Sequence, residues 1–284
     1  MEKKSINGAL IINKEKGMTS RDVVNILCKK LGTKSIGHIG TLDPIATGVL
    51  VCLIGKYTKL TNTLMEHGKE YIASFKLGIL TDTLDITGNI LKEEKYLIDE
   101  NRLLEVLNSF KGKYNQEVPI YSAVKKDGKK LYEYARNGEK IDLPKREVEI
   151  YDINLISIVD EIVTISVKVS KGTYIRSLIR DIGQKLGTYG TMTDLKRTKL
   201  GNFKLEDAYT LEQINNNDFK LMNLKDLIDL EEVNLDEKEY FKVKNGQILN
   251  IKTDKYILFK YQNIEVALYQ KYNDDKIKPL IMFN

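Results

Sequence analysis

Two long stretches in which apolar and polar residues alternate, 146–158 and 162–169, constrain the fold of this chain more than any other feature. Such alternation is typical of β-strands with one buried face, because successive side chains point to opposite sides of a sheet. Only Val159-Asp160-Glu161 separates the two stretches. They therefore predict an antiparallel pair of strands joined by a short turn.

Helices and further strands are predicted around this pair. Thr19-Ser20 offers an N-cap for a helix that Gly32 ends, and 174–186 predicts a strongly amphipathic helix. The remaining predicted elements are a helix over 99–110, strands over 8–13 and 69–77, and a buried strand or helix over 49–54. Because these elements do not follow a regular βαβ alternation, the predicted fold class is α+β and not a doubly wound sheet.

The composition excludes several classes of protein. No apolar stretch approaches the roughly 20 residues that cross a bilayer, and the first residues lack the apolar core and cleavage site of a signal peptide. We therefore expect a cytoplasmic protein in which Cys28 and Cys52 are buried free thiols. With only His38 and His67 besides the two cysteines, no metal site is expected. No Walker or G-x-G-x-x-G motif is present, so no cofactor is expected either.

The segment Thr33–Gly48 is dense in glycine, threonine and serine, and it predicts a loop between two buried segments. Its centre is Asp43-Pro44. Proline restricts the residue before it to extended geometry, and the surrounding glycines let the backbone approach a ligand closely. An aspartate before proline also forms turns by bonding its own backbone. A loop held between buried segments is nevertheless a favourable place for a functional site.

The segment Gly37-His-Ile-Gly-Thr-Leu-Asp43-Pro-Ile-Ala-Thr-Gly48 resembles the catalytic loop of TruB-type tRNA pseudouridine synthases. Further segments resemble motifs of that family in the family order, from about residue 8 to about 210. They are Asn13-Lys-Glu-Lys-Gly-Met-Thr-Ser20, Lys69-Glu-Tyr-Ile-Ala73, Thr81-Asp-Thr-Leu-Asp-Ile-Thr-Gly88, Tyr121-Ser-Ala-Val-Lys125, Leu131-Tyr-Glu-Tyr-Ala-Arg136, Lys171-Gly-Thr-Tyr-Ile-Arg-Ser-Leu178 and Leu195-Lys-Arg-Thr198. The chain departs from the family pattern at Glu15, Ile39 and Val118, none of which replaces a catalytic group.

The resemblance implies a role for each of the following residues. Asp43 is the essential carboxylate, Arg176 is the guanidinium that keeps it ionised, and Tyr71 stacks on the target base and is a candidate for proton abstraction. Tyr174 and Leu195 line the uracil pocket, and His38 fills the space that the uridine vacates when it leaves its stack. Lys14 and Asp85 are expected to be supporting residues.

A basic segment follows these motifs and is expected to bind RNA. From Lys125 to Arg146 there are eight basic residues against four acidic ones, with tyrosines interleaved. Cations can hold phosphates while the rings stack on bases, although a solvated surface loop has a similar composition. By resemblance, about 119–146 is the insertion that clasps the T-arm of tRNA. The residues expected to contact RNA are Lys125, Lys126, Lys129, Lys130 and Arg136.

The resemblance implies the pseudouridine synthase fold, with a mixed and mainly antiparallel central sheet flanked by helices. The expected organisation is a catalytic domain over 1–215 and a small β-rich, PUA-like RNA-binding unit over 216–284. Its strands are expected near 256–260, 264–268 and 279–283. The expected activity is conversion of uridine 55 in the T-loop of tRNA to pseudouridine, by a monomer without an obligatory protein partner. Two rival hypotheses are a tRNA-binding and folding factor with the same fold and a synthase that depends on a guide RNA.

Overall fold

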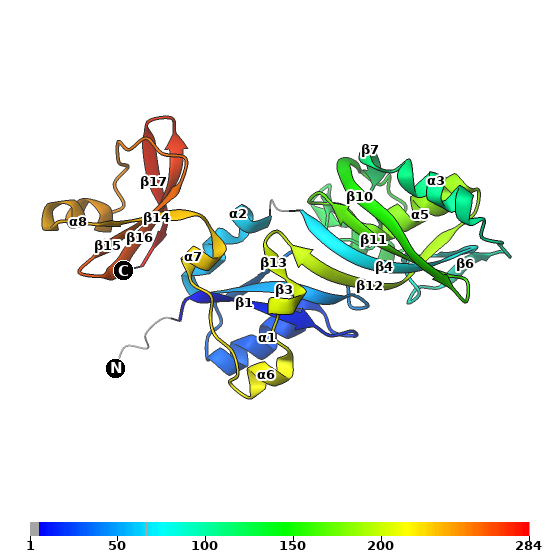
Figure 1. Ribbon diagram of the computed structural model, residues 1–284, viewed down its shortest axis with the longest axis horizontal. Helices are drawn as coiled ribbons and strands as arrows, with labels where there is room; N and C mark the ends of the chain where they lie inside the picture. Colours follow the sequence, from blue (N-terminus) through cyan, green and yellow to red (C-terminus); the bar gives the residue numbers. More distant parts are fainter. Residues whose placement is uncertain (1–5, 66–67, 284) are drawn as a thin grey trace.

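The computed structural model describes residues 6–65 and 68–283, and its largest element is a twisted mixed sheet (Figure 1). In the described residues the strand order is β1-β3-β12-β4-β11-β10-β7, with β2 added beside β3 and β13 beside β12. Within this sheet, the short pairing of β3 with β12 is parallel and the other pairings are antiparallel. The strands are β1 Gly8–Lys14, β2 Ile36–Ile39, β3 Thr47–Ile54, β4 Lys69–Leu77, β7 Gly112–Glu117, β10 Lys145–Val159, β11 Ile162–Val169, β12 Gly190–Leu200 and β13 Phe203–Lys204. The prediction of a mixed, mainly antiparallel sheet is confirmed.

The hairpin of β10 and β11 is the antiparallel pair predicted from the alternating stretches. Val159 pairs with Ile162, and the two residues between them, Asp160 and Glu161, have φ angles of 48° and 65°. Positive φ at both central residues is the geometry that matches a two-residue turn to the twist of its strands. The predicted strands over 8–13 and 69–77 are present as β1 and β4.

Helices cover the sheet as the amphipathic patterns indicate. Thr19 caps α1 through a capping box, and Gly32, with φ of 63°, ends it. Buried side chains of α1 and α5 belong to one continuous apolar cluster that also includes β3, β4 and β11. The helices and helical turns before residue 216 are α1 Ser20–Leu31, η1 Gly55–Leu60, α2 Thr61–Met65, α3 Glu100–Asn108, α4 Leu131–Arg136, α5 Ile175–Leu186, η2 Leu205–Asp207 and α6 Leu211–Asn215.

The predicted loop Thr33–Gly48 is wrong in part, because two of its segments belong to the sheet. Ile36–Ile39 forms β2 and pairs antiparallel with the end of β3, and Thr47 and Gly48 begin β3. The glycines of this segment indicated a loop, although it contains a strand in which Ile36 and Ile39 are buried. Residues 49–54 were predicted to form either a strand or a helix, and they form a strand. They belong to β3, which lies between β1 on one side and β12 and β2 on the other.

Two small hairpins and a second sheet complete the molecule. The hairpins are β5 Ile79–Thr81 with β6 Ile90–Glu93, and β8 Lys125–Lys126 with β9 Lys129–Lys130. The second sheet has the order β14-β15-β16-β17 and comprises Leu230–Asn234, Tyr256–Tyr261, Ile264–Asn273 and Lys276–Met282, preceded by α7 Leu224–Leu227 and accompanied by α8 Glu237–Lys244. Its Leu258, Leu268 and Ile281 pack against β1, β3 and η1 in a shared apolar cluster. The three C-terminal strands predicted from the sequence are thus present, and β14 is an additional one.

Two further sequence expectations have structural outcomes. Cys28 and Cys52 are both free thiols; Cys52 is fully buried, whereas Cys28 is half-buried at the margin of the core. Within the described ranges, every helix is too short or too polar to traverse a lipid bilayer.

Candidate active site

The loop that carries Asp43 connects β2 to β3 and is held by the last residue of β1 and by the segment that follows it. Lys14 Nζ donates to the carbonyl oxygens of Glu15 at 2.8 Å, Met18 at 2.7 Å and Pro44 at 3.4 Å. The Gly17 amide also donates to the Pro44 carbonyl at 2.8 Å. Lys14 is fully buried. Its ammonium therefore joins the end of β1 to the residue after Asp43.

Ser20 and Arg197 hold the same loop at two more places, and no residue pattern pointed directly to either role. Buried Ser20 exchanges hydrogen bonds with Leu42, accepting from its amide at 2.9 Å and donating to its carbonyl at 3.2 Å. Arg197 donates to the carbonyl oxygens of Gly40 and Val49, both at 2.7 Å. One guanidinium thus spans the beginning and the end of the loop. Both residues lie in segments that resemble family motifs, and this was the only available indication.

Asp43 and Arg176 form the central ion pair of the site, although 133 positions separate them in the sequence. Arg176 Nε lies 2.9 Å from Asp43 Oδ2, and Nη2 donates to Oδ1 at 3.1 Å. This is a two-point, charge-assisted contact, which fixes the orientation of the carboxylate. The Arg176 side chain is only 6% exposed, whereas that of Asp43 is 36% exposed. A buried guanidinium therefore holds the Asp43 carboxylate, which itself remains accessible from solvent.

Arg176 also joins the site to two other segments. Its Nη1 donates to the Thr83 carbonyl at 2.8 Å, and its Nη2 donates to the Tyr121 carbonyl at 3.0 Å. The buried carboxylate of Asp85 lies 3.8 Å from Nη1 and accepts from Thr83 Oγ1 at 3.0 Å. The expected supporting residue Asp85 thus contacts Arg176 and not Asp43 in the described structure. Through Tyr121, the basic insertion also contacts Arg176.

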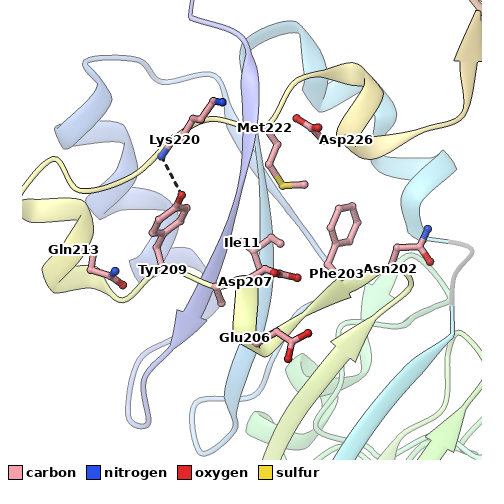
Figure 2. Close-up of a pocket in the computed structure, with 11 residues that line it drawn as sticks. Ile11, Asn202, Phe203, Glu206, Asp207, Tyr209, Gln213, Lys220, Met222 and Asp226 are labelled. Carbon is pink, nitrogen blue, oxygen red and sulfur yellow. Dashed lines mark hydrogen bonds between the residues drawn. The ribbon is translucent and has the colours of Figure 1, made fainter.

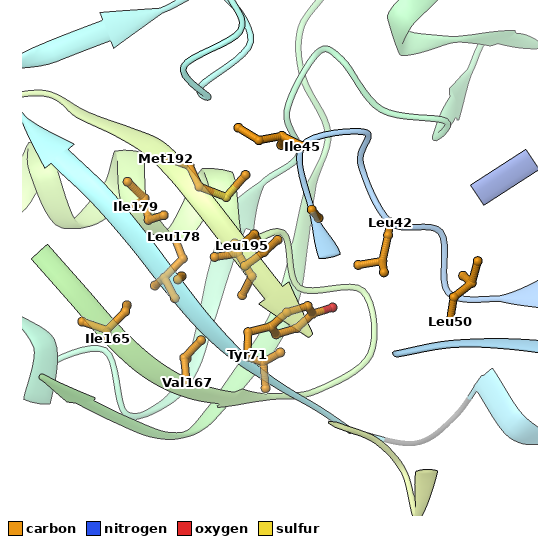
Figure 3. Close-up of a cluster of buried hydrophobic side chains, with 14 of the residues drawn as sticks. Leu42, Ile45, Leu50, Tyr71, Ile165, Val167, Leu178, Ile179, Met192 and Leu195 are labelled. Carbon is orange, nitrogen blue, oxygen red and sulfur yellow. The ribbon is translucent and has the colours of Figure 1, made fainter. Parts of the chain in front are cut away.

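Tyr71 and Leu195 lie next to each other in the apolar wall beside the loop (Figure 3). Tyr71 pairs with Arg197, and Leu195 with Ala73, across the β4–β12 ladder. Both side chains are largely buried, at 7% and 5% exposure. Leu42 and Ile45 from the loop of Asp43 belong to the same cluster. The structure therefore brings these two predicted pocket residues to the flank of the loop.

Tyr174 is the N-cap residue of α5, two positions before Arg176. Its backbone is fixed by fully buried Gln116, which accepts from the Tyr174 amide at 2.8 Å and donates to its carbonyl at 3.1 Å. The Arg146 guanidinium lies 5.7 Å from the centre of the Tyr174 ring, within range of a cation–π contact. Tyr174 is half-buried, so its ring is partly available to a ligand.

His38 lies on β2, opposite Cys52 on β3, two residues before the loop begins. Burial, together with the charges of Arg21 and Arg197, lowers the pKa of His38. Its Nδ1 is buried and has no hydrogen-bond partner among the described residues. The lowered pKa favours the neutral imidazole, which is suited to packing or to accepting a hydrogen bond.

The lysines of the insertion are less free than their sequence suggested. Lys126 Nζ donates to the Asp142 carbonyl at 2.6 Å, and Lys129 pairs with Glu139 at 2.6 Å. Lys130 donates to the Tyr132 hydroxyl at 3.2 Å, and the Arg136 guanidinium lies 5.3 Å from the centre of the same ring. Lys125 and Arg136 are the more exposed members of the set. Most of these cations therefore also stabilise the insertion itself.

Lys14→Met is expected to lower the free energy of unfolding by about 1–3 kcal/mol, because three partly buried carbonyl groups lose a charged donor. Burial is the main cause that lowers the pKa of Lys14 to about 8, and nearby Asp43 opposes it. Thermal unfolding at pH 7, where the ammonium is still largely protonated, measures the loss. Lys16→Met is the matched control: Lys16 is 57% exposed and pairs with Asp194 at the surface. An equal change in both variants would contradict a clamping role for Lys14.

A separate hollow of 490 Å³ lies at the outer edge of β1, between η2, α6 and α7 (Figure 2). Its lining includes three carboxylates, Glu206, Asp207 and Asp226, together with Tyr209 and Lys220. None of its lining residues belongs to the loop of Asp43 or contacts Arg176. The hollow is therefore separate from the Asp43 site. Across the described ranges, no three histidine, cysteine or acidic side chains are grouped closely enough to hold a metal ion.

Comparison with known proteins agrees with this arrangement. Residues 28–175 match the family model described as TruB family pseudouridylate synthase, N-terminal domain, and residues 176–238 match the tRNA pseudouridylate synthase B C-terminal domain. The tRNA pseudouridine synthase B of Caldanaerobacter subterraneus is 41% identical over 98% of this chain and 100% of the relative. That of Fusobacterium nucleatum is 44% identical over 95% of this chain and 93% of the relative.

Among solved structures, a chain of a Cbf5-Nop10-Gar1 complex has a TM-score of 0.69 and 25% sequence identity, covering 98% of this chain and 85% of that one. This similarity confirms the predicted pseudouridine synthase fold. The family models together span most of the chain, including the loop of Asp43 and the segment of Arg176. The chain belongs to the TruB family of pseudouridylate synthases.

Proposed function

We propose that this enzyme converts uridine to pseudouridine at position 55 in the T-loop of tRNA, without a guide RNA or a cofactor. The observation that carries the proposal is the two-point contact between half-exposed Asp43 and buried Arg176, on a loop flanked by Tyr71 and Leu195. The relatives named tRNA pseudouridine synthase B support the substrate class, because the match extends over almost the whole length of both chains.

The chemistry that we propose for Asp43 follows from the reaction. Pseudouridine formation breaks the bond from ribose to uracil N1, turns the base, and forms a new bond from ribose to C5, which loses its proton. A carboxylate can act as the nucleophile that holds the fragments between these steps. The Arg176 guanidinium contacts both oxygens of this carboxylate and orients them. Tyr71 is the candidate for removing the C5 proton.

The uridine must leave its stack in order to reach Asp43, at a cost of a few kcal/mol. We propose that Tyr71, Tyr174 and Leu195 receive the flipped base and that His38 fills the space it leaves in the T-loop. The position of His38 on β2, two residues before the loop of Asp43 begins, supports this role. We propose that Asp85 supports the site through its ion pair with Arg176.

We further propose a catalytic domain over 1–215 and a PUA-like RNA-binding unit over 216–284. The insertion over about 119–146 closes on the T-arm through its basic side chains. The Tyr121 carbonyl on Arg176 supports this proposal, because it places the base of the insertion at the catalytic pair. We expect the enzyme to act in the cytoplasm as a monomer that needs no protein partner.

Neutralising Lys125, Lys126, Lys129 and Lys130 together is expected to weaken tRNA binding and to flatten its salt dependence. Removal of each lysine–phosphate interaction lowers the log–log slope by up to about 0.7 to 0.9. Measuring affinity against salt for parent and variant tests this, with the modified position mapped in each. Because Lys126 and Lys129 also hold Asp142 and Glu139, Lys125→Gln alone provides the cleaner test. Parental slopes in both variants would assign the segment to a solvated surface loop.

The proposed function is tested directly by incubating the pure protein with an unmodified tRNA transcript and mapping pseudouridine by carbodiimide labelling and primer extension. We expect a single primer-extension stop that maps pseudouridine to position 55 of the tRNA, without added guide RNA, metal or nucleotide. A protein that binds and refolds tRNA without making pseudouridine would instead be a folding factor. Modification only in the presence of a guide RNA would support the guide-dependent alternative.

A further inference from the structure

The positively charged side chains of Lys69 and Arg197 both lie beside Gly40, the first residue of the catalytic loop. A methyl group built on Gly40 would lie 3.2 Å from Arg197 Nη1 and 3.4 Å from Lys69 Cε. Lys69 stands two residues before Tyr71 on β4, and Arg197 pairs with Tyr71 across the ladder. Alternation along the strand therefore places Lys69 on the same sheet face as Tyr71.

This pair of cations has no counter-charge in the described part of the chain. Arg197 is fully buried, uses Nε and Nη2 on backbone carbonyls, and leaves Nη1 without a partner among the described residues. Burial and then the charges of Arg197 and Lys171 lower the pKa of Lys69 to about 8, and no carboxylate of the described residues opposes them. On the opposite face of the same strands, Lys168 and Lys199 both lie within 4 Å of the Glu70 carboxylate, at 3.7 and 3.8 Å.

A partly buried ammonium beside a buried guanidinium is an unfavourable arrangement until an anion joins it. The bound anion gains charge-assisted hydrogen bonds, which are about twice as strong as neutral ones. The position next to Gly40 brings such an anion to the entrance of the loop that carries Asp43. A phosphodiester of RNA is the anion that accompanies any nucleotide entering this loop.

We propose that Lys69, with Arg197 behind it, forms an anion site that binds a backbone phosphate adjacent to the target uridine. Lys69 makes the direct contact, because it is only partly buried. Arg197 contributes its charge and holds Gly40, so that the site and the catalytic loop move together. This inference rests on the proposed function, since it takes the ligand to be RNA.

The test compares Lys69→Met with Lys69→Arg and with Lys168→Met, a lysine from the opposite sheet face that is 54% exposed. Affinity for unmodified tRNA transcript is measured against salt, and single-turnover rate at saturating tRNA is measured separately. Lys69→Met is expected to lower the log–log slope by about 0.7 to 0.9 and to weaken binding about fivefold at 0.1 M salt. Lys69→Arg and Lys168→Met are expected to keep the parental slope.

The pH dependence of binding gives a second measurement. Lys69 carries its charge below about pH 8, so parental affinity is expected to fall as the pH rises through that range, whereas Lys69→Arg retains affinity to about pH 9 because arginine stays protonated. The charged groups around Lys69 are Arg197 on β12 and Lys171 after β11, and behind Arg197 lie Lys14 on β1 and His38 on β2. Only Lys69 differs between the two proteins, so the difference between their profiles reports its charge.

Each outcome bears on the proposal. A reduced slope in Lys69→Met with a parental slope in Lys69→Arg supports it. A parental slope in Lys69→Met overturns it, and so does a slower single turnover with unchanged affinity, which would assign Lys69 to the chemical step or to loop support. A parent that binds tRNA with normal salt dependence but forms no pseudouridine contradicts the proposed function and not this site. Thermal unfolding of each variant verifies that the fold is retained.

Discussion

Asp43→Asn is expected to abolish pseudouridine formation, with a loss of at least about 10⁴-fold in single-turnover rate. The amide keeps the shape of the side chain but cannot act as the anionic nucleophile at the ribose or the base. The tRNA affinity is expected to stay within about tenfold of the parent, because binding depends on many phosphate contacts and catalysis on one carboxylate. Mapping pseudouridine in the product and measuring affinity on the same preparations separates the two effects.

Asp194→Asn is the matched control, since Asp194 is 48% exposed, pairs with Lys16 at the surface, and directly precedes Leu195. It is expected to retain the parental rate. Arg176 keeps its contacts with Thr83, Tyr121 and Asp85 when Asp43 is changed, so the yield of folded Asp43→Asn protein should be near the parental yield. An active Asp43→Asn enzyme would remove the mechanism proposed here.

Elements with a strong periodic pattern were the ones that could be predicted. The alternation on either side of Asp160 specified the β10–β11 hairpin, and the apolar face of 174–186 specified α5. The pattern failed for β2, where Gly37 and Gly40 suggested a loop although Ile36 and Ile39 are buried against β3. Strand pairing depends on partners far away in the chain, and a local composition does not contain that information.

The active site was predictable for residues within family motifs, but its contacts were not. No spacing indicates that Arg176 reaches Asp43 across 133 positions, and only the resemblance named the pair. The roles of Ser20 and Arg197 were missed for a physical reason: their partners are backbone groups of Gly40, Leu42 and Val49. A backbone acceptor is present at every residue, so it leaves no pattern of residue types that sequence reasoning can detect.

For the cations of the insertion, the sequence overestimated how many are available to bind RNA. A count of charges treated Lys126, Lys129 and Lys130 as free for RNA, yet each contacts a neighbour within the insertion. Lys69 stands inside a family motif but attracted no attention, because its lack of a described counter-charge becomes visible only in three dimensions. Charge composition thus indicated a nucleic-acid partner, whereas the structure is needed to separate internal pairs from available cations.

Arg176→Met is expected to lower the single-turnover rate by about 10³-fold or more while leaving tRNA affinity within about tenfold. Removal of the guanidinium takes away both donors that orient Asp43 and leaves the Thr83 and Tyr121 carbonyls without their charged donor. Oriented donors of this kind are each worth about 10²–10³ in rate at enzyme sites. Arg176→Lys keeps one positive charge but cannot make the two-point contact, so its rate is expected to recover only in part.

The buried position of Arg176 also predicts a cost in stability, which must be separated from the effect on rate. Removing one partner of a buried ion pair costs about 3–5 kcal/mol, and Asp85 is only 8% exposed in its side chain. Arg180→Met is the control: Arg180 lies one turn later on α5, is 13% exposed, and pairs with Glu117 and Asp181 instead of Asp43. We expect both variants to unfold at lower temperature, but only Arg176→Met to lose turnover per folded molecule when assayed well below that temperature. Equal residual rates in the two variants would reduce Arg176 to a structural residue and would leave Asp43 without the partner on which the proposed mechanism depends.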